Sequence, residues 1–506
     1  MSNDPLNLYT LFESRFPTDR GDTAIETETR ATYSFAELHA QSAKAANALT
    51  HLGVNPGDRV AVQAPKSAAA LFLYLGCLRA GAIYLPMNTA YTAKEVDYLL
   101  RDAEPKVFVA DAGNSDVMEV AKNAGVPNVL TLDAEGQGTL SDLTATSAVD
   151  FATVNTHSDD IAAILYTSGT TGQPKGAMLS HGNLASNALT LHKYWGFVPG
   201  DVLLHSLPIF HAHGLFVALP TALLNGSKLI FLPGFNAAQV VERLPRATVF
   251  MGVPTHYVRL LAEKDFDRGC VAKMRLFVSG SAPLMEDTFR EFEQRTGHTI
   301  LERYGMTETA MNTSNPYDGA RVPGSVGPPL PGIRVRVCDE HGHEVPQGET
   351  GVLEVKGPNV FKGYWRNPEK TKSEFRDDGF FITGDLSRID EKGYVHIVGR
   401  AKDLIISGGY NVYPKEVETA LIELPGISDA AVVGVPHADF GEGVTAVVVA
   451  DGGATVDEAE VIAALKKDLA SYKVPKRVIA VTDIPRNTMG KVQKNALRET
   501  YKDLYQ

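Results

Sequence analysis

The first half of the chain alternates between helical and extended patterns of apolar positions. Residues 36–52 place apolar side chains at helical spacing and stop before Gly53, and residues 93–103 follow the same spacing. Short apolar runs at 58–64 and 106–111 predict buried strands instead. Alternation of this kind is typical of an α/β fold built on a doubly wound, largely parallel sheet.

The same pattern continues toward the middle of the chain. A helix is expected at 67–80 and a strand and turn at 81–88. Further strands are expected at 161–167, 202–208, 229–234, 248–254 and 275–281. The longest apolar stretches, 68–78 and 214–224, are far shorter than the ~20 residues that span a bilayer. We expect them to be buried core helices, and we expect no membrane span.

The pattern changes after about residue 325. Short β-rich pieces separated by Gly and Pro predict a smaller sheet or a distorted barrel, and the last hundred residues show a compact α+β pattern. We therefore predict a large domain at 1–400 and a small C-terminal domain at 401–506. The β-rich pieces are 333–339, 351–357 and 394–400; the C-terminal helices are 414–424 and 457–470, and its strands are 429–435 and 444–450.

Composition and charge narrow the function classes. At 506 residues the chain is too long for one ordinary core, and 44% hydrophobic with 21% charged residues is a globular composition. The net charge of −12 argues against a nucleic-acid partner, because phosphate backbones need a basic face. The three cysteines, Cys77, Cys270 and Cys338, form no CxxC pair. With Asp4 and Glu13 in place of an export signal, they predict a cytoplasmic protein.

The strongest local signal is the string YTSGTTGQPKG at 166–176, which follows an apolar run. Hydroxyl groups and bare backbone N–H groups are what a triphosphate needs from a loop, and Lys175 adds a positive charge. The string is not a P-loop of the GxxxxGK[ST] type, because Gly176 follows the lysine. The expected phosphate-binding residues are Thr167, Ser168, Gly169, Thr170, Thr171 and Lys175.

This loop resembles the signature loop of the adenylate-forming superfamily, which includes acyl-CoA synthetases, carrier-loading adenylation domains and luciferases. The resemblance continues in order at 279–284 (SGSAPL), 304–308 (YGMTE), 383–385 (TGD) and 399–418, and ends at 485–491 (PRNTMGK). It implies an adenylate-forming enzyme fold with a mobile small domain. It also implies two half-reactions, in which a carboxylate attacks the α-phosphate of Mg·ATP and a thiol then displaces AMP.

The resemblance implies a role for each matched residue of the nucleotide site. Tyr304 would stack on adenine, Thr307 would contact the α-phosphate, and Glu308 would hold Mg²⁺, which prefers oxygen ligands. Asp385 would accept from the ribose hydroxyls, and Arg400 would contact ribose and phosphate. Further expected nucleotide contacts are Ser281, Ala282, Pro283, Glu302 and Gly305.

The C-terminal motifs would supply the residues that exchange places between the two half-reactions. Lys402 falls at the position of the hinge, and Lys491 would bridge the incoming carboxylate and the α-phosphate in the first half-reaction. The loop that lines the coenzyme A tunnel would contain Ser407, Gly408, Gly409 and Tyr410. Because PRNTMGK resembles a site of regulatory acetylation, a lysine acetyltransferase and a deacetylase are expected partners at Lys491.

The acyl pocket points to a diacid. Arg303 directly precedes Tyr304, where enzymes for neutral acids commonly have a small residue. A guanidinium there suits a second carboxylate. Arg259, His211 and Ser279 are the other expected pocket residues. Within the superfamily, the strings ERYGMTETAMNTSNPYDG and LPIFHAHGLF resemble the malonate-activating enzymes, which implies malonate or methylmalonate as substrate and coenzyme A as acceptor.

Several alternatives stay open at this point. Arg303 could pair with Glu302 and leave a pocket for a neutral acid, and Arg259 could be a surface residue. A short-chain, medium-chain or aryl acyl-CoA synthetase, or a domain that loads a carrier protein, would have the same fold. A non-catalytic nucleotide-binding homologue would also have it, although Glu308 and Lys491 are present. The sequence does not distinguish a monomer from a homodimer.

Overall fold

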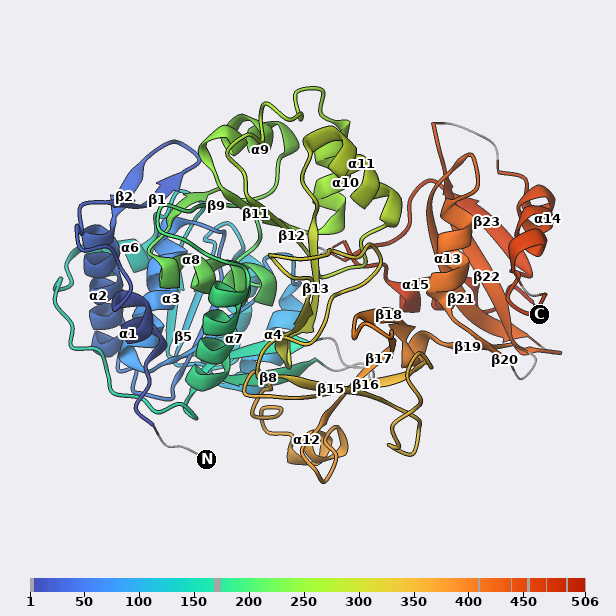
Figure 1. Ribbon diagram of the computed structural model, residues 1–506. Helices are drawn as coiled ribbons and strands as arrows, with labels where there is room; N and C mark the ends of the chain where they lie inside the picture. Colours follow the sequence, from blue (N-terminus) through green and yellow to red (C-terminus); the bar gives the residue numbers. More distant parts are fainter. Residues whose placement is uncertain are drawn as a thin grey trace. The chain divides into compact units, whose positions relative to one another are not determined.

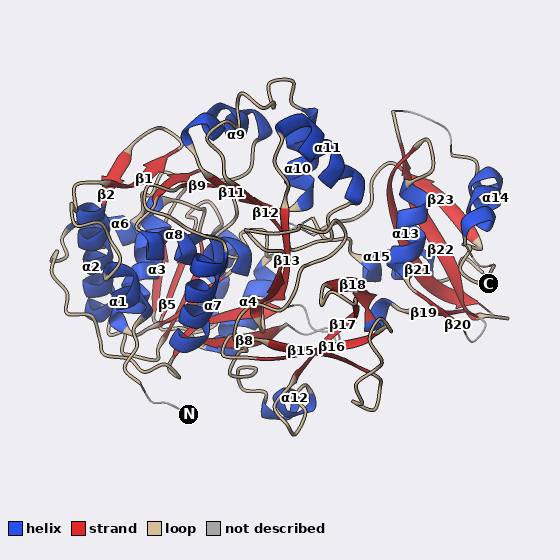
Figure 2. Ribbon diagram, in the orientation of Figure 1, coloured by secondary structure: helices blue, strands red, loops and turns tan. Residues whose placement is uncertain are grey.

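The computed structural model describes residues 4–167, 174–407, 410–437, 439–452, 456–469, 471–487 and 490–505. The chain divides into two compact units. Unit 1 comprises Met1–Val335 and Val355–Phe381, and unit 2 comprises Arg336–Glu354 and Ile382–Gln506. Figures 1 and 2 show the elements of both units along the chain.

A six-stranded sheet forms one layer of unit 1 and has the strand order β6-β5-β3-β4-β7-β8. Its strands are parallel except for the β7–β8 hairpin, in which Thr167 pairs with Lys175. Strands β3, β4 and β5 are buried almost throughout, as expected for a parallel sheet covered on both faces. The strands are β3 Arg59–Gln63, β4 Ile83–Pro86, β5 Val107–Ala110, β6 Asn128–Thr131, β7 Ile161–Thr167 and β8 Lys175–Ser180.

An eight-stranded sheet follows, in the order β14-β13-β12-β11-β9-β10-β1-β2. Its six inner strands are parallel, and β2 and β14 are antiparallel at the two edges. One face is packed by a core cluster that includes Phe250, Phe277 and Phe292. The strands are β1 Thr23–Thr27, β2 Thr32–Ser34, β9 Val202–His205, β10 Lys228–Phe231, β11 Val249–Gly252, β12 Leu276–Ser279, β13 Leu301–Met306 and β14 Ala310–Ser314.

The helices of unit 1 start and stop where the local sequence provides caps. Ser34, Thr92 and Ser180 each form a capping box at a helix N-terminus, and Gly81 and Gly226 end helices in the left-handed conformation. The helices are α1 Leu8–Glu13, α2 Phe35–His51, α3 Ala68–Ala80, α4 Ala93–Ala103, α5 Ser115–Asn123, α6 Thr139–Ala145, α7 His181–Tyr194, α8 Leu219–Asn225, α9 Ala237–Arg243, α10 Pro254–Ala262, α11 Glu286–Thr296 and α12 Pro368–Ser373, with a π-helix at His213–Ala218 and a 3-10 turn at Leu244–Arg246.

Unit 2 contains most of a four-stranded sheet, β15-β16-β17-β18, and a five-stranded sheet in which β23 joins the path β20-β19-β22-β21. A core of Val, Ile, Leu and Ala side chains packs helices α13 and α14 onto the second sheet. The strands are β15 Arg334–Cys338, β16 Gly351–Lys356, β17 Phe381–Ile389, β18 Val395–Arg400, β19 Ile405–Ser407, β20 Tyr410–Val412, β21 Ile427–His437, β22 Gly441–Ala450 and β23 Arg477–Val481; the helices are α13 Pro414–Ile422, α14 Glu458–Asp468 and α15 Lys494–Tyr501, with a 3-10 turn at Ala401–Asp403.

The predicted α/β organisation is confirmed, and two features differ from expectation. The stretch 214–224 is not one α-helix, because a π-helix at His213–Ala218 precedes α8. The compact units do not divide at residue 400, because residues 336–354 and 382–400 group with the C-terminal part. The position of the functional hinge stays a prediction. Among the described residues, no helix is long and apolar enough to cross a membrane.

Candidate active site

The last residues of β11 and β12, Gly252 and Ser279, lie in one row with Glu302 near the start of β13. Gly252 lies beside Ser279, and Ser279 lies beside Glu302, in the register of these parallel strands. Open α/β sheets bind ligands at the carboxyl edge of the strands, because the loops that follow the strands surround it. The predicted pocket residues Ser279 and Arg303 therefore come from neighbouring strands.

Arg303 is a buried guanidinium aimed at this edge. It is 3% exposed and lies directly over Gly280, where an added Cβ would be 2.3 Å from the arginine Cζ. Its Nε and Nη2 atoms have no hydrogen-bond partner among the described residues. Burial lowers the pKa of Arg303 to about 9, although the charge of Glu302 acts in the opposite direction. A protonated guanidinium with two unsatisfied nitrogens is suited to binding a carboxylate.

His213, the first residue of the π-helix, lies near this group, and His211 in the preceding turn contacts His213. His211 is half-buried, and its Nδ1 accepts a hydrogen bond of 3.3 Å from the backbone N–H of His213. His213 is 1% exposed, and in the described structure its Nε2 has no hydrogen-bond partner. Burial, and then the charge of Arg303, hold the pKa of His213 well below its ordinary value. His213 is therefore a neutral imidazole that could donate to an anion or accept from a hydroxyl.

The turn after β12 carries the next predicted residues. Ser279 is fully buried, and its Oγ has no hydrogen-bond partner among the described atoms. Ser281 adopts a φ of 73°, a strained conformation for a residue with a side chain, and its Oγ lies 3.4 Å from Nδ1 of His213. The turn is tied back to β13, because Oε1 of Glu302 accepts from the Leu284 N–H at 3.0 Å. Ala282 and Pro283 lie in the same turn.

Arg259 has different surroundings from Arg303. It lies on the exposed side of α10 next to Val258, which is 53% exposed. His256, in the first turn of this helix, is half-buried, and its ring stacks on Phe235 with 3.9 Å between centroids. Burial, and then the charge of Arg259, lower the pKa of His256 to about 3. A role for Arg259 in acid binding stays a prediction.

Two of the residues predicted to bind phosphate, Thr167 and Lys175, lie in a network around Glu308. This carboxylate is 5% exposed, and its Oε1 accepts from Thr167 Oγ1 at 3.3 Å and from the hydroxyl of Tyr364 at 3.1 Å. The structure thus joins the end of β7 to the β13–β14 turn, across 141 residues of sequence. Lys175 lies 3.4 Å from Oε1 of Glu374 and 4.7 Å from the ring centre of Tyr364. The predicted residues Thr167, Lys175 and Glu308 therefore share one network.

Tyr364 and Glu374 belong to this network and were not predicted. The hydroxyl of Tyr364 also lies 2.5 Å from Oε2 of Glu374. Burial, and then the charge of Glu308, raise the pKa of Tyr364. In the sequence, Tyr364 stands in the string GYWRNPEK, but nothing in that string indicates a contact with Glu308.

The β13–β14 hairpin presents Tyr304, Gly305 and Thr307. A Cβ on Gly305 would lie 1.8 Å from the carbonyl oxygen of Ala310, so the hairpin needs glycine there. The register shifts between Tyr304 and Gly305, and Tyr304 and Thr307 are half-buried. A half-buried aromatic and hydroxyl on this turn are available to a ligand. The remaining predicted loop residues, Ser168, Gly169, Thr170 and Thr171, lie outside the described residues.

Within unit 2, Asp385 and Arg400 lie opposite each other on β17 and β18. Asp385 is 3% exposed, and its Oδ1 lies 2.7 Å from Nε of Arg400. The pair holds an acceptor and a donor side by side, and the predicted contacts with ribose and phosphate stay predictions. Lys402 is exposed in the 3-10 turn that follows β18.

The C-terminal motifs occupy two further turns of unit 2. Ser407 is buried and pairs with Tyr410, which is 59% exposed and stacks on Tyr472. Gly408 and Gly409, the predicted tunnel residues between them, lie outside the described residues. Lys491 is exposed; its N–H donates to Oδ1 of Asn487, and the preceding Gly490 adopts a φ of 75°. The glycine permits the turn that presents Lys491 to solvent.

The chain matches known families and proteins over nearly its full length. Residues 12–365 match the AMP-binding enzyme family, and residues 416–491 match the AMP-binding enzyme C-terminal domain. The crystal structure of ATP-bound MatB from Rhodopseudomonas palustris is 58% identical, with a TM-score of 0.97 over 99% of this chain and 100% of that chain. Malonate–CoA ligase ACSF3, mitochondrial, from Homo sapiens is 35% identical over 94% of this chain and 90% of the relative. A feruloyl-CoA synthase from an Amycolatopsis species is 37% identical over 92% and 94%.

Proposed function

Because the chain belongs to the family of AMP-binding enzymes, we propose that it joins malonate to coenzyme A through an acyl-adenylate and releases AMP and pyrophosphate. The single observation that carries the choice of acid is Arg303. A neutral acyl chain in this pocket would leave two buried guanidinium nitrogens without a partner, and burying a charge that way is costly. A dicarboxylic acid satisfies them with its second carboxylate.

The pocket groups fit a small diacid for a further reason. Ser279 and His213 add a hydroxyl and a neutral imidazole whose Oγ and Nε2 are buried and have no partner among the described residues. Together with Arg303 they offer several donors to one carboxylate. The similarity to the human malonate–CoA ligase supports this choice of acid.

In the first half-reaction, a malonate oxygen would attack the α-phosphorus of ATP while the bond to pyrophosphate breaks. Thr307 and Lys491 would hold the α-phosphate, and the positive charge of Lys491 would offset negative charge that develops during transfer. Tyr304 would orient the adenine ring, and the Asp385–Arg400 pair would hold the ribose. Binding the second carboxylate at Arg303 would leave the first one positioned for attack.

Magnesium fits the Glu308 network. Glu308 is a buried carboxylate whose position is fixed by Thr167 and Tyr364, and a hard cation prefers such an oxygen ligand beside phosphates. Glu308 would hold the ion, with Thr167 and Lys175 nearby for the phosphate oxygens. When bound, the ion would neutralise charge on the departing pyrophosphate.

In the second half-reaction, the coenzyme A thiolate would attack the acyl carbonyl and AMP would leave. The turn that contains Ser407 and Tyr410 would guide the thiol, and rotation of the C-terminal part at Lys402 would replace Lys491 by this turn. Acetylation of Lys491 would remove the charge that the first half-reaction uses, so a lysine acetyltransferase could silence the enzyme. The exposure of Lys491 supports this regulation.

Product analysis tests the proposal. Purified protein is incubated with Mg·ATP, coenzyme A and one acid at a time, with malonate, methylmalonate, succinate, acetate, octanoate and coumarate as the panel. We expect AMP and malonyl-CoA, with little thioester from the monoacids. A coumaroyl or octanoyl thioester as the main product would refute the assignment of the acid. Malonyl-AMP without a thioester would refute coenzyme A as the acceptor.

A further inference from the structure

A buried lysine lies outside the site described above. Lys66 follows β3 and precedes Ser67, the N-cap of α3. It is 9% exposed, and its Nζ lies 2.8 Å from Nδ1 of His205, 3.0 Å from the carbonyl oxygen of His205 and 2.8 Å from that of Leu207. The ring centre of Phe231 lies 4.3 Å from the same nitrogen. Lys66, in the loop after β3 of the six-stranded sheet, is therefore hydrogen-bonded to the end of β9 in the eight-stranded sheet.

The hydrogen bonds of Lys66 and His205 bear on the charge of the pair. Nε2 of His205 lies 3.0 Å from the carbonyl oxygen of Gly214. Carbonyl oxygens only accept hydrogen bonds, so the carbonyls of His205, Leu207 and Gly214 together require three N–H hydrogens from the pair. The hydrogen bond between Nζ and Nδ1 requires a fourth. A neutral amine and a neutral imidazole supply three. All four contacts can be hydrogen bonds only if the pair holds one additional proton, which would give it one positive charge.

This charge is costly for the fold. Burial holds the pKa of Lys66 well below its ordinary value, and no carboxylate of the described chain opposes that effect. An apolar side chain of similar length would avoid this desolvation cost but would leave the carbonyls of His205 and Leu207 without their donor. The lysine therefore bears a desolvation cost in exchange for bonds to this one segment.

What the pair holds is the segment 207–214. Lys66 binds its first residue, Leu207, and His205 binds its last residue, Gly214. A Cβ on Gly214 would lie 2.1 Å from the carbonyl oxygen of Pro208, so the two ends of the segment are in backbone contact. His211 and His213 lie between these anchors.

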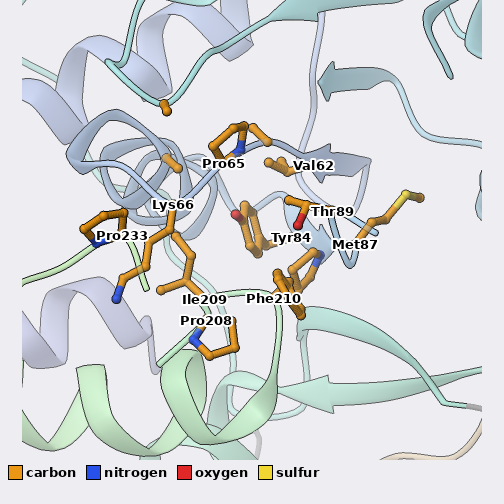
Figure 3. A pocket seen from close by; sticks show the side chains of 14 residues that line it. Val62, Pro65, Lys66, Tyr84, Met87, Thr89, Pro208, Ile209, Phe210 and Pro233 are labelled. Carbon is orange, nitrogen blue, oxygen red and sulfur yellow. The ribbon is translucent and has the colours of Figure 1, made fainter. Parts of the chain in front are cut away.

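Packing is incomplete on one side of this segment. A cavity of about 240 Å³ lies beside it, lined by Pro208, Ile209 and Phe210 and also by Lys66 (Figure 3). Side chains next to a cavity lack contact atoms on that side, so packing restrains them weakly. On that side, the anchors at Leu207 and Gly214 take the place of packing contacts.

We propose that Lys66 and His205 form a charged positioning pair that holds the 207–214 segment, and with it His211 and His213, in place beside Arg303. This inference rests on the proposed function, because it assigns the pair a role in acid binding. Neither residue touches the reacting atoms, so both act through the histidines they position.

Three variants distinguish the effect of the Lys66 bond to Leu207 from the effect of the His205 bond to Gly214. Lys66→Met removes the charge and all three donors at similar side-chain length. His205→Asn keeps an acceptor in the place of Nδ1 and loses the bond to Gly214, whereas His205→Gln keeps a donor for Gly214 and loses the acceptor for Lys66. Arg79→Met is the matched control, because Arg79 is a basic residue 2% exposed that binds Tyr9, Ser42 and backbone carbonyls instead.

We expect Lys66→Met to lower kcat/KM for malonate by about 10- to 100-fold, because small displacements of positioning groups have effects of this size. The KM for ATP should change by less than about 2-fold, and Arg79→Met should leave malonate kinetics unchanged. In ¹⁵N-histidine-labelled protein, the ring signals of His211 and His213 should shift in Lys66→Met. A purely structural role of the lysine would not move them at temperatures where the variant is folded.

The proposal is overturned by a folded Lys66→Met with unchanged malonate constants and unshifted signals of the two histidines. If that variant does not fold, the His205 variants decide, because both must lose malonate activity if each anchor is needed. Wild-type protein that makes no malonyl-CoA would refute the proposed function instead. The histidine signals would then still show whether the pair positions the segment.

Discussion

Replacing Arg303 by methionine should separate activity from stability. The substitution keeps a long side chain over Gly280 and removes the positive charge. Because Nε and Nη2 have no partner among the described residues, we expect a bound diacid to supply one. Truncating one partner of a buried charge pair costs about 2–5 kcal/mol. At 1.36 kcal/mol per tenfold change, kcat/KM for malonate should fall by about 30-fold to several thousand-fold.

The stability of the same variant should move in the opposite direction. Arg303 is 3% exposed, and replacing buried ionic groups by apolar ones of similar volume often stabilises a protein by about 1–4 kcal/mol. We therefore expect Arg303→Met to unfold at the same or a higher urea concentration than the wild type. Arg79→Met, which leaves several acceptors without their donor, should unfold at a lower concentration.

The assay measures kcat/KM for malonate and for acetate in ATP–pyrophosphate exchange, together with the affinity for ATP. Arg303→Met should lose malonate activity, change acetate activity far less and bind ATP normally. Arg79→Met should keep the malonate-to-acetate ratio of the wild type. An Arg303→Met variant with the malonate-to-acetate ratio of the wild type, whether both activities are kept or both fall equally, would refute the reasoning.

Four further predictions follow from other parts of the structure. Gly280→Ala should lower kcat/KM for malonate about 10-fold or more, because its Cβ would displace the guanidinium of Arg303; steady-state kinetics with unchanged malonate constants would contradict this. Glu308→Gln should raise the Mg²⁺ concentration needed for half-maximal pyrophosphate exchange at least about 10-fold, and an unshifted magnesium titration would remove this residue from the metal site. Lys491→Ala should block adenylation but still form thioester from supplied malonyl-AMP; equal loss of both steps in single-turnover assays would show that its role is not specific to the first. The pKa of the buried His181 is lowered to about 4 by burial, whereas it is about 6.5 in the unfolded chain, so its contribution is intact above pH 6.5 and falls by about 2 kcal/mol by pH 5. His181→Asn should remove that part of the pH dependence in urea denaturation, and an identical dependence in both proteins would contradict the assignment.

Local pattern alone predicted the elements that the sequence specifies locally. Residues 93–103 and 161–167 coincide with α4 and β7, because a capping Thr92 and a run of buried apolar residues fix these elements without help from distant parts. The π-helix at His213–Ala218 was not predictable in this way. Its first turn is held by the bond from His205 to Gly214, and that bond depends on tertiary structure.

For the site, the sequence could name candidate residues but could not give their geometry. The motif match named Thr167 and Glu308, but their contact crosses 141 residues and needs both sheets in place. The exposed position of Arg259 and the contact of Tyr364 with Glu308 are likewise set by helix rotation and tertiary packing. Unsatisfied atoms, such as Nε of Arg303, can be recognised only when all neighbours are known.

The most direct test of the account is one turnover with ¹⁸O-labelled malonate and an equal concentration of unlabelled acetate, with Mg·ATP and coenzyme A, followed by mass spectrometry. Attack of a carboxylate oxygen on the α-phosphorus leaves one ¹⁸O in AMP, and the diacid pocket selects malonate. The account predicts malonyl-CoA as the main thioester and AMP that carries a single ¹⁸O. Unlabelled AMP, ADP as the nucleotide product, or acetyl-CoA as the main thioester would contradict it.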